Sequence, residues 1–254
     1  TPAAYYTAMV QENITLTIFS YDMAKELSDA AQTAGKKACV HIKLDTGMSR
    51  IGFLPVRENV AEVLKIRELP GIEITGMFTH FAKADETDKR FTNEQFEKYM
   101  WMKEALEKAG VTFEKYHCCN SAGIIDLPEA ELDLVRAGIA TYGLYPSEEV
   151  KKDRVPLRPA LTLISHVAHV KWIEEGVPVS YGGTFVSKRR TKVATIPVGY
   201  GDGYPRSLSN KGYVLIRGQK APIIGRVCTL RKSMEQRLET WLLWWAVMEQ
   251  KRFR

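Results

Sequence analysis

The chain has 254 residues, of which 45% are hydrophobic and 26% are charged, and its formal net charge is +6. This length suits one large domain or two smaller ones, and the composition is that of an ordinary globular protein. The last 24 residues hold six Lys/Arg and three Asp/Glu and so supply +3 of the net charge. The rest of the sequence shows no basic stripe of the kind that binds nucleic acid. No apolar run is long enough to span a membrane and no signal peptide opens the chain, so we expect a cytoplasmic protein without nucleic-acid or membrane partners.

The four cysteines follow neither a zinc-site spacing nor a disulfide framework. Cys118 and Cys119 are neighbours, whereas Cys39 and Cys228 lie far from them in the sequence. All four have apolar neighbours, which is typical of buried thiols in a reducing compartment. We therefore expect no metal site.

Up to residue 149, predicted strands alternate with predicted helices. Apolar and β-branched runs predict strands at 14–20, 38–45, 72–81, 112–120 and 132–140. Helical spacing predicts helices at about 21–34, 57–69 and 92–109 and a short one near 130, with Ser20 and the pair Thr92/Gln95 as caps. The alternation indicates either a small open parallel sheet or about the last five strands of a (β/α)8 barrel, which needs eight strands. The abrupt start at Thr1 favours the partial barrel.

After residue 150 the pattern changes to short strands separated by turns. They are predicted at 160–172, 177–185, 192–198, 212–216 and 221–227. No helical period intervenes, so we expect an antiparallel β domain at 150–228. The Trp-rich stretch 229–254 continues no strand. It is either an amphipathic terminal helix or sequence foreign to the domain, such as a frameshifted end, and we favour the second interpretation.

Polar residues recur at the predicted strand ends. In a barrel such ends converge on one mouth, where the chemistry lies. A serine and a glycine at a helix start suit a phosphate, and an arginine among apolar residues needs an anionic or acceptor partner. The set predicts a phosphate-bearing cofactor, and it comprises Lys43, Asp45, Arg50, His80, Asn120, Ser121, Arg136, Gly138 and Ile139.

Each of these residues also has a simpler explanation when taken alone. Lys43 and Asp45 can form a structural ion pair, His80 can be a satisfied core or surface histidine, and Ser121 can be only a helix cap. Tyr181 and Tyr200 stand beside glycines, where tyrosine usually packs or forms turns. A tyrosine acts as a base only if a nearby cation lowers its pKa from about 10.

Seven motifs in one order resemble the alanine racemase family: HIKLDTGMSRIGF, FTHF, CCNSAG, LVRAGIATYGLYP, VSYGGTF, IPVGYGDGYPR and APIIGRVC. The resemblance extends from Thr1 to Cys228. It implies an N-terminal barrel that binds pyridoxal 5′-phosphate, followed by a C-terminal β domain. It also implies a homodimer whose active sites are each completed by the partner's β domain. The implied reaction is racemisation of L- and D-alanine, which supplies D-alanine for cell-wall peptidoglycan.

The resemblance also implies a role for individual residues. Tyr181 is similar to the family's catalytic tyrosine, the base on the L-face of the substrate. Arg50 resembles the arginine that contacts the cofactor's phenolic oxygen and the substrate carboxylate, and Lys43 resembles the carbamylated lysine that positions this arginine. Arg136 resembles the arginine at the pyridine nitrogen, backed by His80. The cofactor-binding residues implied around the phosphate are Asn120, Ser121, Gly138, Ile139 and Tyr200.

The sequence departs from the family in two places. It has no counterpart of the KADAYGHG-like motif that carries the cofactor's lysine, and Thr229-Leu230 stand where the family has Met-Asp after Cys228. We therefore expect an internal fragment that is inactive alone, with Lys43 not taking over as the cofactor's lysine. The alternatives are a catalytically dead remnant for cofactor binding or dimerisation, and an amino-acid racemase of broader substrate range.

Overall fold

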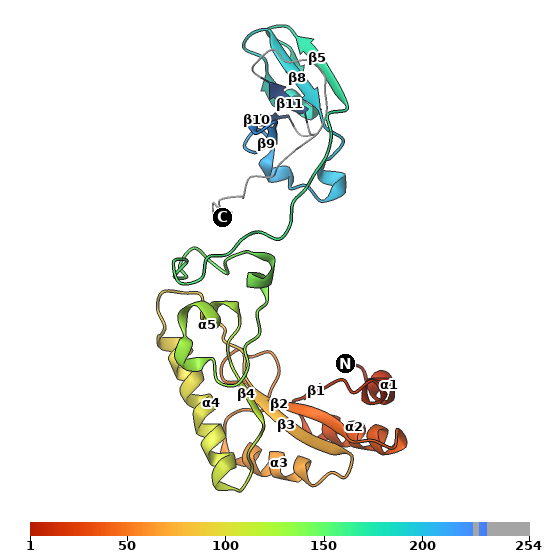
Figure 1. Cartoon of the computed structure of the whole chain (residues 1–254), viewed down its shortest axis with the longest axis vertical. Coiled ribbons are helices and arrows are strands. Elements are labelled where there is room, and N and C mark those ends of the chain that lie inside the picture. The colour runs from red at the N-terminus through yellow and green to blue at the C-terminus, as the bar shows by residue number, and fades with distance from the viewer. Residues whose placement is uncertain (226–228, 233–254) are drawn as a thin grey trace. The chain divides into compact units, whose positions relative to one another are not determined.

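The computed structural model describes residues 1–225 and 229–232, which belong to two compact units, Thr1–Arg158 and Pro159–Arg254 (Figure 1). The first unit ends at Arg158 and not at 149, because Val150 is buried in its core and the Arg154 guanidinium donates to the carbonyl oxygens of Ile125 and Asp126. No helix in these described ranges is long and apolar enough to cross a membrane.

A four-stranded sheet in the order β1-β2-β3-β4 forms the centre of the first unit, and all its strand pairs are parallel. Its strands are β1 (Leu16–Ile18), β2 (Ala38–Lys43), β3 (Ile72–Phe78) and β4 (Lys115–His117). The helices are α1 (Tyr6–Gln11), α2 (Tyr21–Thr33), α3 (Arg57–Arg67), α4 (Arg90–Lys108) and α5 (Ser121–Asp126). Strand, helix and parallel strand follow one another, as the alternation predicted.

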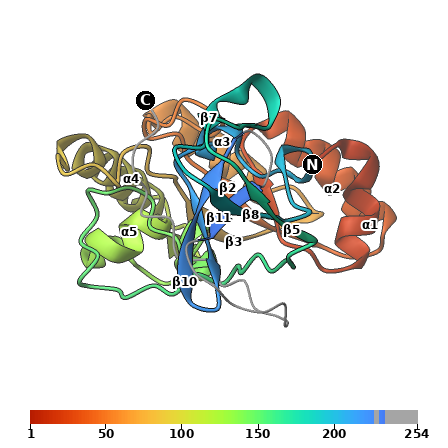
Figure 2. The same cartoon turned by 90° about the horizontal axis from the view of Figure 1, so that it is seen from above.

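The helices bury their apolar sides against the apolar side of the sheet. Val40, Ile42 and Leu44 of the β2 region are fully buried in one cluster with residues of α2, α3 and α4. The Tyr99 hydroxyl of α4 donates to the carbonyl oxygen of Met77 at 2.9 Å, which fixes α4 to β3. Figures 1 and 2 show α1 beside α2 at the β1 end of the sheet.

One predicted helix cap is confirmed and the other is wrong. The Ser20 hydroxyl accepts from the amide of Met23 at 3.3 Å, as expected at the start of α2. By contrast, α4 begins at Arg90, so Thr92 and Gln95 lie within it. The Gln95 amide instead bonds to Thr46, to the carbonyl of His80 and to the amide of Ala82. The spacing of Thr92 and Gln95 matches a capping box, but Gln95 makes tertiary hydrogen bonds and caps no helix start.

The fifth predicted strand, 132–140, does not form. Leu132 has a left-handed φ of 52°, and a 3-10 helix begins at Ile139. Two backbone bonds still tie the segment to the β4 region, from Asp133 to Tyr116 and from Arg136 to Cys119. The Asp133 carboxylate accepts from the amide of Tyr116 at 2.9 Å and so takes the place of a ladder acceptor. The described part of the first unit therefore has four strands.

The second unit consists of antiparallel β structure, as predicted. Its larger sheet has the order β5-β8-β11-β10-β9, and a separate pair is formed by β6 and β7. The strands are β5 (His169–Ile173), β6 (Pro178–Val179), β7 (Phe185–Val186), β8 (Thr191–Thr195), β9 (Tyr213–Ile216), β10 (Gln219–Ile224) and β11 (Thr229–Lys232).

Three details of the second unit differ from the sequence prediction. Residues 160–168 form no strand, and a 3-10 helix at Tyr181–Gly183 interrupts the predicted strand 177–185, because Ser180 and Gly182 have positive φ. Strand β11 lies beyond Cys228, where no continuing strand was expected, and pairs with both β8 and β10. The expected foreign tail was 229–254: its first four residues form β11, and 233–254 lie outside the described residues.

Candidate active site

Three residues at strand ends form one row across the parallel sheet. Lys43 of β2 pairs in register with Phe78 of β3, which pairs with His117 of β4. Paired residues point to the same face, and this face is opposite to Ile42 and Leu44 because side chains alternate along a strand. The Lys43 ammonium lies 5.4 Å from the centre of the Phe78 ring, and His117 stacks on that ring at 4.8 Å with the planes 6° apart.

Arg136 joins this row from the segment that follows α5. Its guanidinium lies 5.2 Å from the centre of the Phe78 ring. Nη2 donates to the carbonyl oxygens of Thr79 and Cys118 at 2.8 and 3.0 Å, and Nη1 meets His117 Nδ1 at 2.5 Å. These bonds use three of its five N–H groups and involve no carboxylate. Within the described residues the other two donors have no hydrogen-bond partner. We call Lys43, Phe78, His117 and Arg136 the strand-end cluster.

The histidine that contacts Arg136 is His117 and not His80. In the described chain the hydrogen bonds of Arg136 go to His117 and to the two carbonyls. His80 is half-buried, and burial, with Arg136, Arg50 and Lys43 nearby, lowers its pKa to about 4. His80 is therefore neutral near the cluster. Sequence reasoning overlooked His117, although an acceptor beside a donor-only arginine is what the chemistry requires.

Lys43 is buried, with 2% of its surface exposed. Burial lowers its pKa to about 8; Asp45 acts in the opposite direction, while Arg136 and Arg50 lower it further. The simple ion pair with Asp45 is not among the salt bridges of the described residues. The Asp45 carboxylate instead accepts from the amides of Gly47 and Ser49 at 3.0 and 2.9 Å, and the Lys43 ammonium donates to the carbonyl of Leu44. Arg50 follows this turn and is exposed.

Ser121 connects the start of α5 to the loop that carries Gly138. Its hydroxyl accepts from the amides of Gly138 and Ala140 at 2.9 and 3.2 Å. The cap of α5 is Asn120, whose side chain accepts from the amide of Gly123, so the interpretation of Ser121 as only a cap is wrong. A hydroxyl that accepts twice still has one hydrogen to donate. Ser121 can therefore offer that hydrogen to an anion.

The two tyrosines singled out from the sequence lie in the second unit. Tyr181 begins the 3-10 helix Tyr181–Gly183 and has 65% of its surface exposed. Tyr200 begins the 3-10 helix Tyr200–Asp202, where the guanidinium of Arg206 lies 5.6 Å from the centre of its ring. Ile139, in the first unit, is likewise exposed, at the start of its own 3-10 helix. All three side chains are exposed and can therefore contact a ligand or another protein chain.

Comparisons with known proteins identify relatives for both units. The family model of the alanine racemase N-terminal domain matches residues 1–146, and that of the alanine racemase C-terminal domain matches residues 160–234. A curated alanine racemase of Desulforamulus reducens is 49% identical over 219 residues, which cover 86% of this chain and 59% of that protein.

Solved structures give the same result. An alanine racemase of Clostridium difficile has a TM-score of 0.88 and 41% identity, and the match covers 94% of this chain and 63% of that one. A structure of the C. difficile enzyme in complex with cycloserine has a TM-score of 0.85 and 39% identity over the same shares. The chain thus spans less than two thirds of the length of these relatives. The sequence, the fold and these matches agree that the chain belongs to the alanine racemase family, whose members are amino-acid racemases.

Proposed function

We propose that this chain supplies the cofactor-binding face of a pyridoxal 5′-phosphate enzyme that interconverts L- and D-alanine in the cytoplasm, providing D-alanine for peptidoglycan. The observation that carries the proposal is Arg136, which is largely buried, has no carboxylate partner among the described ion pairs and keeps two free N–H donors. A buried cation without a counter-charge is costly, so a ligand acceptor is the expected partner. The cycloserine complex of the C. difficile relative is consistent with an amino-acid site.

The donor set fits a phosphate at one end and an aromatic nitrogen at the other. The Ser121 hydroxyl, with Asn120, Gly138 and Ile139 of the same unit, would hold the phosphate, and Arg136 would face the ring nitrogen. Tyr200, in the second unit, is assigned to the phosphate by the family resemblance alone. When bound, pyridoxal phosphate supplies an electron sink for the carbanion formed at the α-carbon of the amino acid. No metal is needed in this assignment.

Arg136 controls how strong that sink is. A guanidinium stays protonated and only donates hydrogen bonds, so Arg136 contacts a ring nitrogen without transferring a proton to it. Its partner His117 cannot supply that proton either, because burial and the nearby Arg136 lower the pKa of His117 to about 3. The ring nitrogen then stays uncharged. A weaker sink favours return of the proton to the α-carbon over side reactions, which suits a racemase.

Lys43 is chemically suited to carbamylation. Only the neutral amine attacks carbon dioxide, and a pKa of about 8 gives Lys43 more of that form near neutral pH than an exposed lysine has. The amine nitrogen bonds to the carbon, one C=O π bond opens onto oxygen, and the N–H proton leaves to water. The carbamate would carry a negative charge toward Arg50 and Arg136, both of which repel the ammonium form. Arg50 would thereby be positioned for the substrate carboxylate.

Tyr181 is the proposed base on the L-face of the substrate. Its 65% exposure leaves the phenol free to enter the site of a second copy of the protein, in a homodimer with shared active sites. Such a role requires a cation close to the phenol in the assembled dimer, since a tyrosine at its ordinary pKa of about 10 is a poor acceptor near neutral pH.

The 254 residues alone constitute a second candidate: a chain that binds the cofactor without turning over alanine. The observation in its favour is the absence of a KADAYGHG-like motif from the sequence. Lys43 is the lysine of the strand-end cluster, and we assign it to positioning Arg50 and not to a covalent bond with the cofactor. Racemisation by this chain should then be close to that of free cofactor.

The experiment combines cofactor binding with activity in the purified 254-residue chain. Pyridoxal phosphate should bind and be displaced by inorganic phosphate, and Arg136→Ala should weaken binding at least tenfold because it removes charged hydrogen bonds. The exposed Arg158→Ala is the matched control and should leave binding unchanged. Failure of the chain to bind the cofactor would refute the proposal.

Two further readouts separate the candidates. Robust racemisation that is lost in Tyr181→Phe would show that the chain is a complete catalyst. Borohydride reduction followed by peptide mapping should give no cofactor adduct at Lys43, and such an adduct would overturn the positioning role. Activity toward other amino acids would show a racemase of broader substrate range.

A further inference from the structure

A second histidine stands behind His117 in the strand-end cluster. His41, on β2, places Nδ1 at 2.8 Å from His117 Nε2, and the two ring centres are 5.0 Å apart. The contacts therefore form a chain from Arg136 through both nitrogens of His117 to His41. His41 lies two residues before Lys43, on the same face of the strand.

The chemistry of the groups fixes where each proton lies. Arginine can only donate, so His117 Nδ1 must accept from Arg136. A neutral His117 then has its proton on Nε2, which donates to His41 Nδ1, and a neutral His41 has its own proton on Nε2. Both rings are neutral, because burial lowers the pKa of each, with Arg136 adding to the effect on His117 and Lys115 to that on His41.

We propose that His41 is a positioning residue, which fixes the tautomer and ring orientation of His117 and thereby the direction in which Arg136 presents its free N–H groups. The geometric part of this inference concerns only the chain itself. Its meaning for the reaction rests on the proposed function, in which Arg136 faces the ring nitrogen of the cofactor.

The backbone of β3 makes room for the His41 ring. Val40 pairs with Ile74, but His41 pairs with Gly76, so Thr75 is an extra residue in β3. Such bulges often stand beside active sites and redirect a side chain. A Cβ at Gly76 would lie 2.6 Å from His41 Nε2 and 2.7 Å from its Cδ2, which no real Cβ tolerates. The bulge and the glycine together leave space for the imidazole, which would have to move if residue 76 carried a Cβ.

Loss of His41 should loosen His117. Its ring is now held by a hydrogen bond at each nitrogen and by stacking on Phe78. His117 is 4% exposed, so without His41 its Nε2–H would lack an acceptor in a site with little access to water. The ring would turn or change tautomer to recover a bond. Arg136 would then lose one of its three anchors.

Nuclear magnetic resonance of the ring nitrogens tests this directly in the 254-residue chain. It contains five histidines, so long-range proton–nitrogen spectra of histidine-labelled protein resolve each tautomer. We expect His117 to be protonated on Nε2 alone in the parent chain. His41→Phe should produce a mixture of His117 tautomers and shift the Arg136 guanidinium signals. His169→Gln, at an exposed position of β5, is the control and should change neither.

Two variants distinguish positioning from mere packing. His41→Asn should restore the single His117 tautomer, because its amide oxygen can accept at the place of His41 Nδ1. Gly76→Ala should reproduce the His41→Phe spectrum while leaving the imidazole in the chain. If His117 keeps a single Nε2–H tautomer and Arg136 keeps its signals in His41→Phe and in Gly76→Ala, the inference is wrong.

Cofactor affinity links the geometry to the reaction. His41→Phe should weaken pyridoxal phosphate binding by about tenfold, and His41→Asn by much less, as expected when a hydrogen bond to a charged group is disturbed. If the tautomer changes but affinity does not, His41 has no role in presenting Arg136 to the cofactor. If the parent chain binds no cofactor, the proposed function fails, whereas the tautomer result still decides the geometric part.

Discussion

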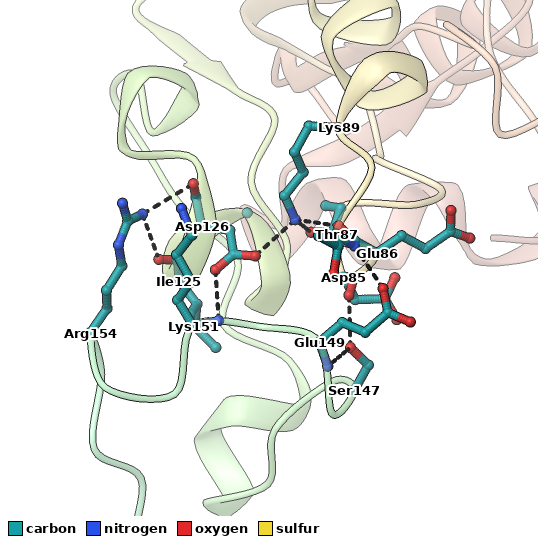
Figure 3. Close-up of polar contacts among 12 residues, drawn as sticks. Asp85, Glu86, Thr87, Lys89, Ile125, Asp126, Ser147, Glu149, Lys151 and Arg154 are labelled. Carbon is teal, nitrogen blue, oxygen red and sulfur yellow. Dashed lines mark hydrogen bonds and ion pairs between the residues drawn. The ribbon is translucent and has the colours of Figure 1, made fainter. Parts of the chain in front are cut away.

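Two groups of charged residues in the first unit, each with one buried charge (Asp126 or Lys43), are built in opposite ways. Figure 3 shows the first, which we call the loop clasp: Lys89, Asp126, Ser147, Lys151 and Arg154, with their partners. The Lys89 ammonium donates to Asp126 at 2.8 Å and to the carbonyls of Ala84 and Glu86, so its three N–H groups are used. The second carboxylate oxygen of Asp126 accepts from the amide of Lys151 at 3.0 Å.

The strand-end cluster lacks such compensation. Lys43 and Arg136 are bound to carbonyl oxygens and an imidazole, and none of the described salt bridges joins either to a carboxylate. The pKa of the neighbouring His80 is lowered first by burial and then by the positive charges of Arg136, Arg50 and Lys43. A fully paired buried charge holds elements together, whereas an unpaired one destabilises the free protein until an anionic or acceptor ligand arrives. On this difference we base the proposal that the loop clasp is structural and that the strand-end cluster binds a ligand.

The largest expected effect comes from breaking the loop clasp. Lys89→Met should lower the free energy of unfolding by about 3 kcal/mol, because it leaves Asp126, with a side chain only 2% exposed, without its cation. Urea denaturation of the purified chain measures the loss. Lys83→Met is the matched control in the same loop, since the Lys83–Glu86 pair is exposed and should cost little.

A double variant sharpens this prediction. Lys89→Met combined with Asp126→Leu should recover much of the lost stability, because no unpaired charge then remains buried. If the double variant is as unstable as the sum of the single ones, the clasp acts through its carbonyl contacts and not through charge pairing.

The strand-end cluster should show the opposite behaviour with pH. Burial lowers the pKa of Lys43 from 10.5 to about 8, which corresponds to roughly 3 kcal/mol of destabilisation. Below pH 8 the lysine is protonated in both folded and unfolded chains, and the penalty is fully present. Between pH 8 and 10.5 only the unfolded chain holds the proton, so stability rises with pH as the penalty disappears.

Comparison with Lys43→Met isolates this contribution from all other titrating groups. In buffer free of carbon dioxide the variant should be more stable than the parent below pH 8, and this advantage should vanish by pH 10.5. Added bicarbonate should reduce the advantage if Lys43 is carbamylated. An advantage independent of pH would mean that Lys43 folds at its ordinary pKa.

The strand-end cluster also shows which features of the site could be predicted from the sequence and which could not. The alternation in β2 predicted a strand, and the neighbouring strand ends predicted a cofactor mouth around Lys43 and Arg136. Alternation normally places polar residues in water, yet Lys43 is buried on the second face of this sheet, which we propose as the face of the site. Spacing alone cannot distinguish a solvated face from a ligand-binding one.

Other parts were beyond prediction because they depend on tertiary contacts. Residues 132–140 have the apolar content of a strand, but the Asp133 side chain occupies a ladder position and Leu132 turns the backbone. His117 was overlooked because it stands in the middle of a predicted strand. Its place became clear only from the register that puts Phe78 beside it and from the donor of Arg136.

One serine of the proposed phosphate site and one serine of the loop clasp allow a matched test of smaller size. Ser121→Ala should weaken pyridoxal phosphate binding by about tenfold, or about 1.4 kcal/mol, since it removes a hydroxyl donor to the phosphate. Ser147→Ala removes the hydroxyl that donates to the carbonyl of Asp85 in the loop clasp and should leave affinity unchanged. Equilibrium titration measures both, and equal losses of affinity would contradict the division between the clusters.

The smallest effect should come from an ion pair whose carboxylate is partly exposed. Lys103 and Glu107 of α4 approach to 2.6 Å, closer than Lys89 and Asp126. The two lysine side chains are equally exposed, at 22% and 21%, but Glu107 is 34% exposed and Asp126 only 2%. Glu107→Gln should lower stability by no more than about 0.5 kcal/mol, and added salt should reduce the difference further. Because the distance favours this pair, a small loss would show that burial, and not proximity, gives the loop clasp its strength. A loss as large as that of Lys89→Met would show that burial of the carboxylate does not set the strength of these ion pairs.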